Sequence, residues 1–208
     1  LLRCSQPCGS TVIFETTPED FDSLWYHYFA LDTDYEAINS SLPSDGAMSE
    51  AAKRASGIRI LNQDGWETLC SFIISQNNNI PRIKKNIRAL CESYGEPVYA
   101  AGSDRTVCAG YSFPDAGTIA RKSSEQELSA LKFGFRSKYI MSAARAVASG
   151  EISLDSIKGM SSDDACSLLC SLNGVGIKVA SCTLLFGFEK YDMFPIDVWM
   201  KKVLERHY

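Results

Sequence analysis

The sequence predicts an all-α fold of many short helices, and three observations support this. Apolar residues recur at intervals of three and four along most of the chain, which places them on one face of a helix. Strand-like sequence is confined to residues 11–14. Helix-start signals precede several apolar runs, such as Thr17 followed by Pro18, and Ser124 followed by Glu127. No repeat of fixed period indicates a solenoid.

Helical patterning begins at residue 17, where acidic residues follow Pro18 in the first turn. Residues 95–115 contain several glycines and prolines and are predicted to be an irregular connection. Further helices are predicted at residues 33–41, 46–56, 64–75, 80–94, 116–122, 124–132, 136–149, 152–157, 161–172, 176–187 and 196–207.

The predicted strand at residues 11–14 has no obvious partner nearby, and a lone strand is unstable. The chain also begins with Leu rather than Met. We therefore expect companion strands upstream. We divide the chain into a remnant of an N-terminal β-domain at residues 1–16 and a helical region at residues 17–208. A helix-hairpin-helix and a key Asp are expected at about residues 161–200 of the helical region.

Composition excludes several protein classes. Of 208 residues, 45% are hydrophobic and 22% are charged, which is typical of a folded globular protein and not of a disordered one. No apolar run reaches the ~18 residues of a membrane-spanning helix, so no membrane partner is expected. The net charge of −4 conceals an asymmetry. Residues 1–67 hold eleven acids and four bases, whereas residues 76–90 and 130–145 each hold four bases and no acid.

The eight cysteines form no C-x-x-C pair, and the chain has only two histidines, so no metal site is expected. Several of the cysteines fall in apolar helical patterns, where a free thiol behaves as a small hydrophobic group. A reducing intracellular compartment fits this usage best, meaning the cytoplasm of a prokaryote or the nucleus of a eukaryote.

A tight turn joins two predicted helices at Gly174, Val175 and Gly176. Glycines directly before a helix leave backbone N–H groups exposed, and the helix dipole adds positive potential there. Such a turn binds a phosphate oxygen without basic side chains, which would let an acidic protein hold DNA. An ordinary helix corner with a glycine cap is the alternative.

Lys178 lies in the first turn of the second helix, where the dipole disfavours a cation and favours the neutral amine. A neutral amine is a nucleophile that can form a Schiff base with a sugar carbon. Asp197 follows Pro195 and begins the last predicted helix, where an anion is favoured. Lys178 and Asp197 together supply the minimum for cleaving an N-glycosidic bond. If each residue is considered alone, the alternative is that Lys178 is an ordinary surface lysine and that Asp197 is a helix N-cap.

The tight turn at residues 174–176, followed by Lys178 and later by the Pro-x-Asp helix start at residues 195–197, resembles the motif of the helix-hairpin-helix Gly/Pro-Asp superfamily of DNA glycosylases. Other segments resemble its 8-oxoguanine branch, in particular residues 71–83 (SFIISQNNNIPRI) and 134–139 (GFRSKY). Further matching positions are Leu2, Tyr28, Phe29, Leu31, Asp32, Arg59, Leu61, Gln63, Asp64, Phe113 and Pro114. Two positions depart from the family pattern. Asn173 replaces a proline, and Trp199 stands where animal members carry a histidine.

The resemblance implies roles for particular residues. Lys178 would be the Schiff-base nucleophile, Asp197 the catalytic carboxylate, and Cys182 would pack on the flipped base. Towards the DNA, Asn77 would fill the gap left by the flipped nucleotide, and Arg82 would bind the orphaned cytosine. Phe135 would wedge into the base stack, and Arg136 would lie beside this wedge. These amino-acid types suit the implied roles, because an arginine can donate two hydrogen bonds to a base edge and an aromatic ring can insert between base steps. The alternatives are helix capping for Asn77 and core packing for Phe135.

We therefore expect a bifunctional DNA glycosylase and AP lyase that removes 8-oxoguanine from duplex DNA during base excision repair. Its partner would be double-stranded DNA containing 8-oxoguanine. The protein would be a monomer and would need no cofactor. Two alternatives remain open. One is an endonuclease III-like enzyme for oxidised pyrimidines, and the other is a non-enzymatic helix-hairpin-helix DNA-binding module.

Overall fold

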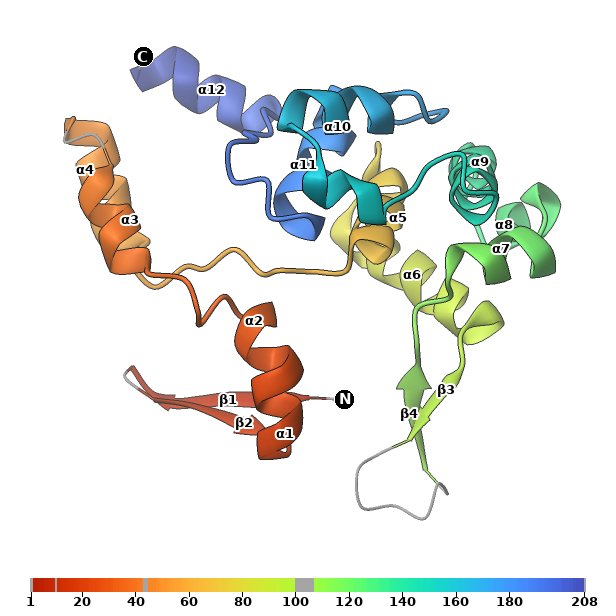
Figure 1. Ribbon diagram of the computed structural model, residues 1–208, viewed down its shortest axis with the longest axis horizontal. Helices are drawn as coiled ribbons and strands as arrows, with labels where there is room; N and C mark the ends of the chain where they lie inside the picture. The colour runs from red at the N-terminus through yellow and green to blue at the C-terminus, as the bar shows by residue number, and fades with distance from the viewer. Residues whose placement is uncertain (1, 10, 43–44, 100–106, 208) are drawn as a thin grey trace. The chain divides into compact units, whose positions relative to one another are not determined.

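The computed structural model describes residues 2–9, 11–42, 45–99 and 107–207. Gln63–Pro195 form one compact unit, called the central unit here. Leu2–Asn62 and Ile196–Tyr208 form a second, called the split unit. Helices make up most of both (Figure 1), which confirms the mainly helical class. Residues 17–62 therefore belong to the same unit as the N-terminal strands, whereas we predicted from the sequence that they belong to the helical region at residues 17–208.

The split unit begins with an antiparallel hairpin, and here the expectation of a lone strand is wrong. Strand β1 (Arg3–Cys8) pairs with β2 (Thr11–Glu15), in a register that places Cys4 opposite Phe14. The polar sequence of β1 gave no strand signal, because pairing with a neighbour and not side-chain pattern makes it a strand. Phe14 packs against Phe21 and Phe29, with ring centroids 5.3 and 5.1 Å apart, so the hairpin is anchored to the helices that follow it.

Those helices begin where predicted, since Thr17 accepts a hydrogen bond of 3.1 Å from the backbone N–H of Asp20. The helices of the split unit are α1 (Pro18–Asp20), a π-helical turn (Phe21–Trp25), α2 (Tyr26–Tyr28), α3 (Tyr35–Ser41), α4 (Gly46–Arg54) and α12 (Val198–His207). Arg59 ties residues 30–35 to the segment after α4. Its Nη1 donates to the Ala30 carbonyl at 2.6 Å, and its guanidinium lies 4.7 Å from the centre of the Tyr35 ring.

The central unit holds the hydrophobic core. Its elements are α5 (Gly65–Ser75), α6 (Ile80–Tyr94), β3 (Pro97–Tyr99), β4 (Cys108–Tyr111), α7 (Ala116–Lys122), α8 (Glu125–Ala130), α9 (Arg136–Ala148), a 3-10 turn (Asp155–Gly159), α10 (Ser162–Cys170) and α11 (Ile177–Gly187). Helix α5 lies in the middle of the unit and buries Leu69, Cys70, Ile73 and Ile74 completely. None of the helices among the described residues is long and apolar enough to cross a membrane.

Helices α6 and α7 have the predicted bounds, but two segments differ from prediction. The connection expected to be irregular contains the β3–β4 hairpin, in which Val98 pairs with Gly110; its residues 100–106 lie outside the described part. The helix predicted at residues 152–157 is only the short 3-10 turn at Asp155–Gly159. Both segments are too short for periodicity to separate strand, turn and helix.

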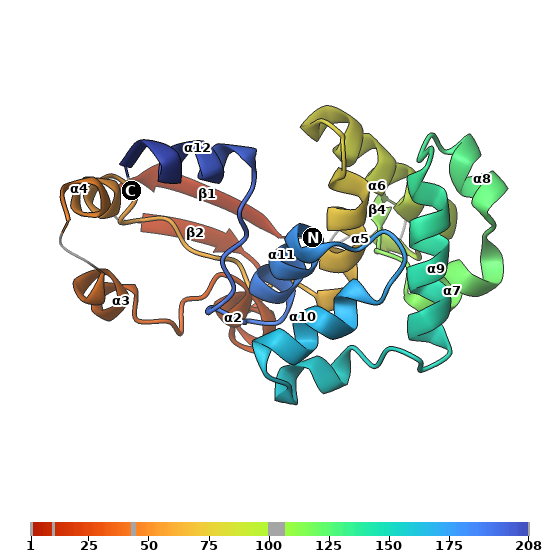
Figure 2. The ribbon, with the colours of Figure 1, turned by 90° about the horizontal axis from the view of Figure 1, so that it is seen from above.

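Helices α5 and α11 lie side by side in both views (Figures 1 and 2). Two glycines allow this close approach. A Cβ on Gly65 would lie 2.3 Å from the ring of Phe188, and a Cβ on Gly187 would lie 3.0 Å from the Gly65 backbone. This packing fixes α11, the helix that carries Lys178, to the buried helix α5.

Candidate active site and DNA interface

The turn at Gly174–Gly176 joins α10 to α11, as the sequence predicts. Gly174 has a φ of +82°, and a Cβ there would meet the ring of Tyr139 at 2.3 Å. Val175 is 5% exposed, and its N–H donates to the Leu172 carbonyl at 3.0 Å. The turn therefore requires glycine at position 174, because a side chain there would be both strained and blocked by Tyr139.

The N-terminus of α11 is open. Gly176 occupies the N-cap position, so no side-chain oxygen at that position accepts the first N–H groups of the helix. A Cβ built on Gly176 would have no atom within 4 Å, and Ile177 beside it is 74% exposed. These N–H groups therefore face open space, and the positive end of a helix dipole favours an anion at such a position.

Lys178 is exposed in the first turn of α11, and its Nζ lies 5.4 Å from the centre of the Phe72 ring. Phe72 belongs to α5 and stacks on Phe186 with ring centroids 5.8 Å apart. Cys182 follows one turn after Lys178 but is only 5% exposed. The amine therefore lies at the surface above an aromatic ring, and the thiol lies deeper on the same helix.

Asp197 caps α12 in the split unit. Its Oδ1 accepts hydrogen bonds from the backbone N–H groups of Trp199 at 2.9 Å and Met200 at 2.8 Å. The side chain is exposed, and so is Trp199, at 72%. The structure therefore gives Asp197 the capping role that its position predicts, and a capping carboxylate keeps acceptor capacity for another partner.

The three consecutive asparagines have three different environments. Asn78 Nδ2 donates to the Ile74 carbonyl at the end of α5, and Asn79 accepts from the Arg82 N–H as the N-cap of α6. Asn77 lies between the two helices, exposed, with a φ of +46°. The helix-end hydrogen bonds are therefore made by the side chains of Asn78 and Asn79, and not by that of Asn77. Within the described part of the chain, the side chain of Asn77 has no hydrogen-bond partner, so it is available to a ligand.

Arg82 and Phe135 are both exposed, as a contact with DNA requires. Arg82 lies in the first turn of α6, where its Nη2 donates to the Lys132 carbonyl at 3.2 Å. Phe135 is 47% exposed and meets the Tyr139 ring edge to face at 5.9 Å. Its exposure argues against the alternative of core packing.

Arg136 directly follows the exposed Phe135 but is itself buried. Its side chain is 2% exposed and donates to the backbone carbonyls of Gln76, Asn77 and Phe133. Burial, and secondarily the positive charge of Arg82, lowers the pKa of the Arg136 guanidinium. Arginine nevertheless remains charged in proteins. In this structure the guanidinium therefore binds loop backbone and is turned away from solvent.

Two residues that sequence reasoning did not single out hold these loops together. Gln76 Nε2 donates to the Gly174 carbonyl at 3.0 Å, which links the end of α5 to the hairpin. The ring of Tyr139 covers Gly174 and contacts Phe135. Both residues fall inside the segments quoted above, but their type alone did not mark them. Among the described residues, no three His, Cys, Asp or Glu side chains form a group that could hold a metal ion.

The central unit therefore brings together all but one of the predicted site residues: Asn77, Arg82, Phe135, Arg136, Gly174, Val175, Gly176, Lys178 and Cys182. Asp197 belongs to the split unit.

Comparison with known families identifies two segments. Residues 8–69 match the family described as 8-oxoguanine DNA glycosylase, N-terminal domain. Residues 70–208 match the HhH-GPD superfamily base excision DNA repair proteins. The chain belongs to the HhH-GPD superfamily. The N-terminal match places it among the 8-oxoguanine DNA glycosylases of that superfamily.

Curated relatives of this member of the 8-oxoguanine glycosylase family support the same assignment. It is 36% identical over 193 residues to an N-glycosylase/DNA lyase of Saccharomyces cerevisiae, an alignment that covers 87% of this chain and 50% of the relative. A probable N-glycosylase/DNA lyase of Methanothermobacter thermautotrophicus is 30% identical, with 86% of this chain and 61% of the relative covered. The chain thus spans about half to three fifths of these curated relatives.

Solved structures give the same result over the full chain. A structure of MBOgg1 in complex with a low-affinity DNA ligand matches with a TM-score of 0.90 and 41% identity, covering 100% of this chain and 70% of that one. The 8-oxoguanine glycosylase/lyase of Clostridium acetobutylicum, bound to double-stranded DNA with cytosine opposite 8-oxoguanine, also matches with a TM-score of 0.90. Its identity is 34%, and 100% of this chain and 69% of that one are covered.

Proposed function

We propose that this chain carries the chemistry of a bifunctional DNA glycosylase and AP lyase that removes 8-oxoguanine from duplex DNA in base excision repair. The observation that carries this proposal is the position of Lys178. It is exposed in the first turn of α11, directly behind an uncapped helix N-terminus that can hold a DNA phosphate. An anion site beside a lysine nucleophile suits a substrate in which a sugar carbon lies next to a phosphate.

In the proposed reaction, the neutral amine of Lys178 attacks C1′ of the flipped nucleotide. A bond from nitrogen to C1′ forms, and the base leaves with the electron pair of its glycosidic bond and takes up a proton. Asp197 stabilises the positive charge that develops on the sugar. The sugar ring then opens to a protonated Schiff base. Loss of a C2′ proton expels the 3′ phosphate, and none of these steps requires a metal ion or a redox cofactor.

The exposed residues of the central unit fit the recognition of duplex DNA. Phe135 would wedge into the base stack, Asn77 would occupy the gap and Arg82 would bind the orphaned cytosine through its donor fork. The hairpin N–H groups would hold the backbone. The Clostridium structure and the MBOgg1 structure both contain DNA, and they share this fold at 34% and 41% identity, respectively. This likeness supports DNA as the partner of this chain. The protein would act as a monomer wherever the genome lies, in the cytoplasm or the nucleus.

Borohydride trapping tests the proposal. The full-length protein that contains this chain is incubated with duplex DNA holding one 8-oxoguanine opposite cytosine, with EDTA present. Borohydride reduces a Schiff base to a stable amine, so we expect a covalent protein–DNA product that undamaged duplex does not give. A duplex with an oxidised pyrimidine is the matched comparison. Trapping on the pyrimidine alone would favour the endonuclease III-like alternative, and no trapping on either duplex would favour a DNA-binding module.

A further inference from the structure

Lys132, in the turn between α8 and α9, has a backbone conformation that lysine rarely adopts. Its φ is +67°, in the left-handed region where a side chain costs energy and where glycine is the usual residue. Gly134, two positions later, adopts a φ of +61° without that cost. Because Lys132 is exposed, its side chain adds no core packing that would offset the strain. Folding alone therefore does not explain a lysine in this turn.

Hydrogen bonds from the backbone hold this turn in place. The Lys132 N–H donates to the Ser129 carbonyl at 2.9 Å, and the Lys132 carbonyl accepts from Arg82 Nη2 at 3.2 Å. The preceding carbonyl, of Leu131, accepts from Nδ2 of the buried Asn86 at 3.1 Å. None of these hydrogen bonds uses the Lys132 side chain, so a change of that side chain should leave the turn in place.

The turn lies beside two of the residues proposed to contact DNA. Arg82, which would bind the orphaned cytosine, donates to its backbone, and Phe135, the proposed wedge, follows three positions later. Lys132 therefore adds a second exposed cation next to Arg82. Neither cation forms an ion pair with a carboxylate among the described residues, and residues 130–145 contain no acid. Two neighbouring like charges repel each other, and a bound anion relieves that repulsion.

We propose that Lys132 binds a phosphate of the undamaged strand, close to the orphaned cytosine. A phosphodiester is the anion that duplex DNA offers at this place, and lysine binds it as a point charge. The contact holds the undamaged strand while Phe135 and Asn77 replace the flipped nucleotide. It carries no sequence information, because phosphate contacts fix position and base contacts read identity. The inference rests on the proposed function, which brings DNA to this face.

Binding to duplex DNA tests this contact without catalysis. The full-length protein is titrated, over a range of salt concentrations, with a duplex that carries a tetrahydrofuran abasic site opposite cytosine and so offers no base to excise. In Lys132→Gln we expect affinity to fall about fivefold, and the slope of log K against log[salt] to become shallower by about 0.9, as for the loss of one phosphate contact. Lys132→Arg keeps the charge, so its affinity should stay within about twofold of wild type.

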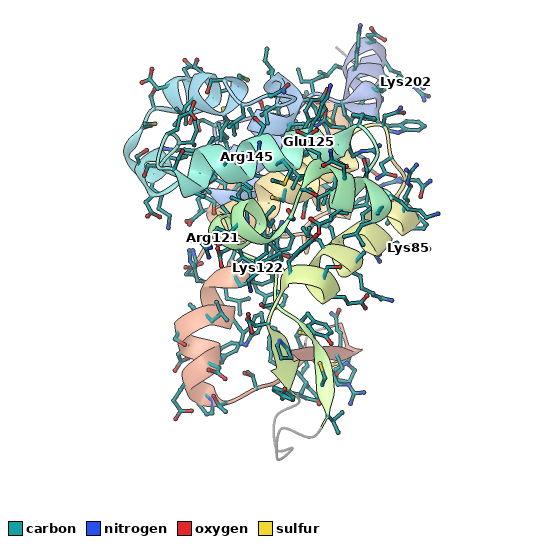
Figure 3. All side chains as sticks on the ribbon, turned by 90° about the vertical axis from the view of Figure 1, so that its right-hand side faces the viewer. Lys85, Arg121, Lys122, Glu125, Arg145 and Lys202 are labelled. Atoms are coloured by element: carbon teal, nitrogen blue, oxygen red, sulfur yellow. The ribbon has the colours of Figure 1, made fainter. Side chains whose placement is uncertain are left out.

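The control is Lys122→Gln, which removes the same charge from another exposed lysine. Lys122 is the last residue of α7, and in Figure 3 it lies well apart from Lys85 of α6. Lys85 is about one helical turn from Arg82. We expect wild-type affinity and an unchanged salt slope in this control. An equal loss in Lys122→Gln and Lys132→Gln would show a general effect of net charge and would overturn the inference.

Neutral methylphosphonates locate the contact. One phosphate at a time is replaced, next to the orphaned cytosine on the undamaged strand or next to the abasic site on the other strand. At one position on the undamaged strand, the replacement should weaken wild-type binding about fivefold and Lys132→Gln binding less than about 1.5-fold, because both changes remove one interaction. Equal losses in both proteins at every position would overturn the inference. Coupling on the damaged strand alone would overturn the assignment of the strand.

Lys132→Gly separates DNA binding from folding. Glycine adopts this φ without strain, so we expect the same loss of affinity as in Lys132→Gln and a melting temperature within about 2 °C of that variant. A melting temperature more than about 5 °C below wild type in both variants would show that the lysine stabilises the turn, which would overturn the inference. If the wild-type protein binds the duplex but excises no 8-oxoguanine, the proposed function fails, while the salt slope and the methylphosphonates still decide the role of Lys132.

Discussion

The N-termini of α11 and α12 carry the two proposed catalytic residues and are built in opposite ways. Helix α11 has glycine at its N-cap and leaves its first N–H groups open, with Lys178 in the first turn. Helix α12 is closed by Asp197, whose Oδ1 accepts two backbone hydrogen bonds. Helix α11 buries six residues in the core of the central unit, whereas α12 buries none.

The difference shows how one structural device serves two purposes. An open N-terminus on a rigid, buried helix offers its dipole to a ligand from outside. A capped N-terminus uses its first N–H groups to hold its own carboxylate in one orientation. A nucleophile and a charge stabiliser have these different requirements, and changes at either terminus test whether the comparison holds.

The largest expected effect is at Lys178. Lys178→Gln should abolish borohydride trapping on 8-oxoguanine DNA, because no other side chain in this first turn offers an amine. Since Lys178 is exposed, thermal stability and DNA binding should remain close to wild type. Trapping at wild-type yield in this variant would show that the nucleophile lies elsewhere.

A smaller effect is expected at Asp197. Asp197→Asn keeps an acceptor for the N–H groups of Trp199 and Met200 but removes the charge. We expect the single-turnover excision rate to fall by roughly 10² or more, with little change in melting temperature. A variant with full activity would show that Asp197 only caps the helix, and a variant that unfolds would show that its charge is structural.

Closing the open terminus should have an intermediate effect on binding. Gly176→Asp would supply α11 with a cap like that of α12, and nothing lies within 4 Å of the added Cβ. Folding stability should hold or rise, while affinity for duplex DNA should fall roughly tenfold, because a carboxylate would occupy the anion site. Gly176→Ala is the control for the added Cβ. Unchanged affinity in Gly176→Asp would mean that this terminus holds no phosphate.

The smallest expected effect concerns stability alone. Asp197→Ala removes the cap of α12, so unfolding free energy should fall by about 1 kcal/mol relative to Asp197→Asn. Urea denaturation of the two variants measures this difference. Equal midpoints would show that the two hydrogen bonds to Asp197 contribute nothing to stability, and the comparison with the uncapped α11 would lose its energetic basis.

Local sequence was a reliable guide where the information is local. The bounds of α6 and α7 follow from apolar spacing and from the caps Asn79 and Asp115. The tight turn at Gly174 was foreseeable because glycine adopts positive φ without strain. The pairing of β1 was not foreseeable, because a polar strand is defined by its partner and not by its own pattern.

The sequence by itself therefore determined the helical class, the tight hairpin and the positions of Lys178 and Asp197, because spacing and helix-end chemistry depend on neighbours in the chain. Only the tertiary structure decided that Arg136 turns inward and binds the backbone of the exposed Asn77. That outcome depends on contacts between residues some sixty positions apart, such as Arg136 with the Gln76 carbonyl. A buried cation is stable only where distant backbone supplies its acceptors, and no local pattern records that.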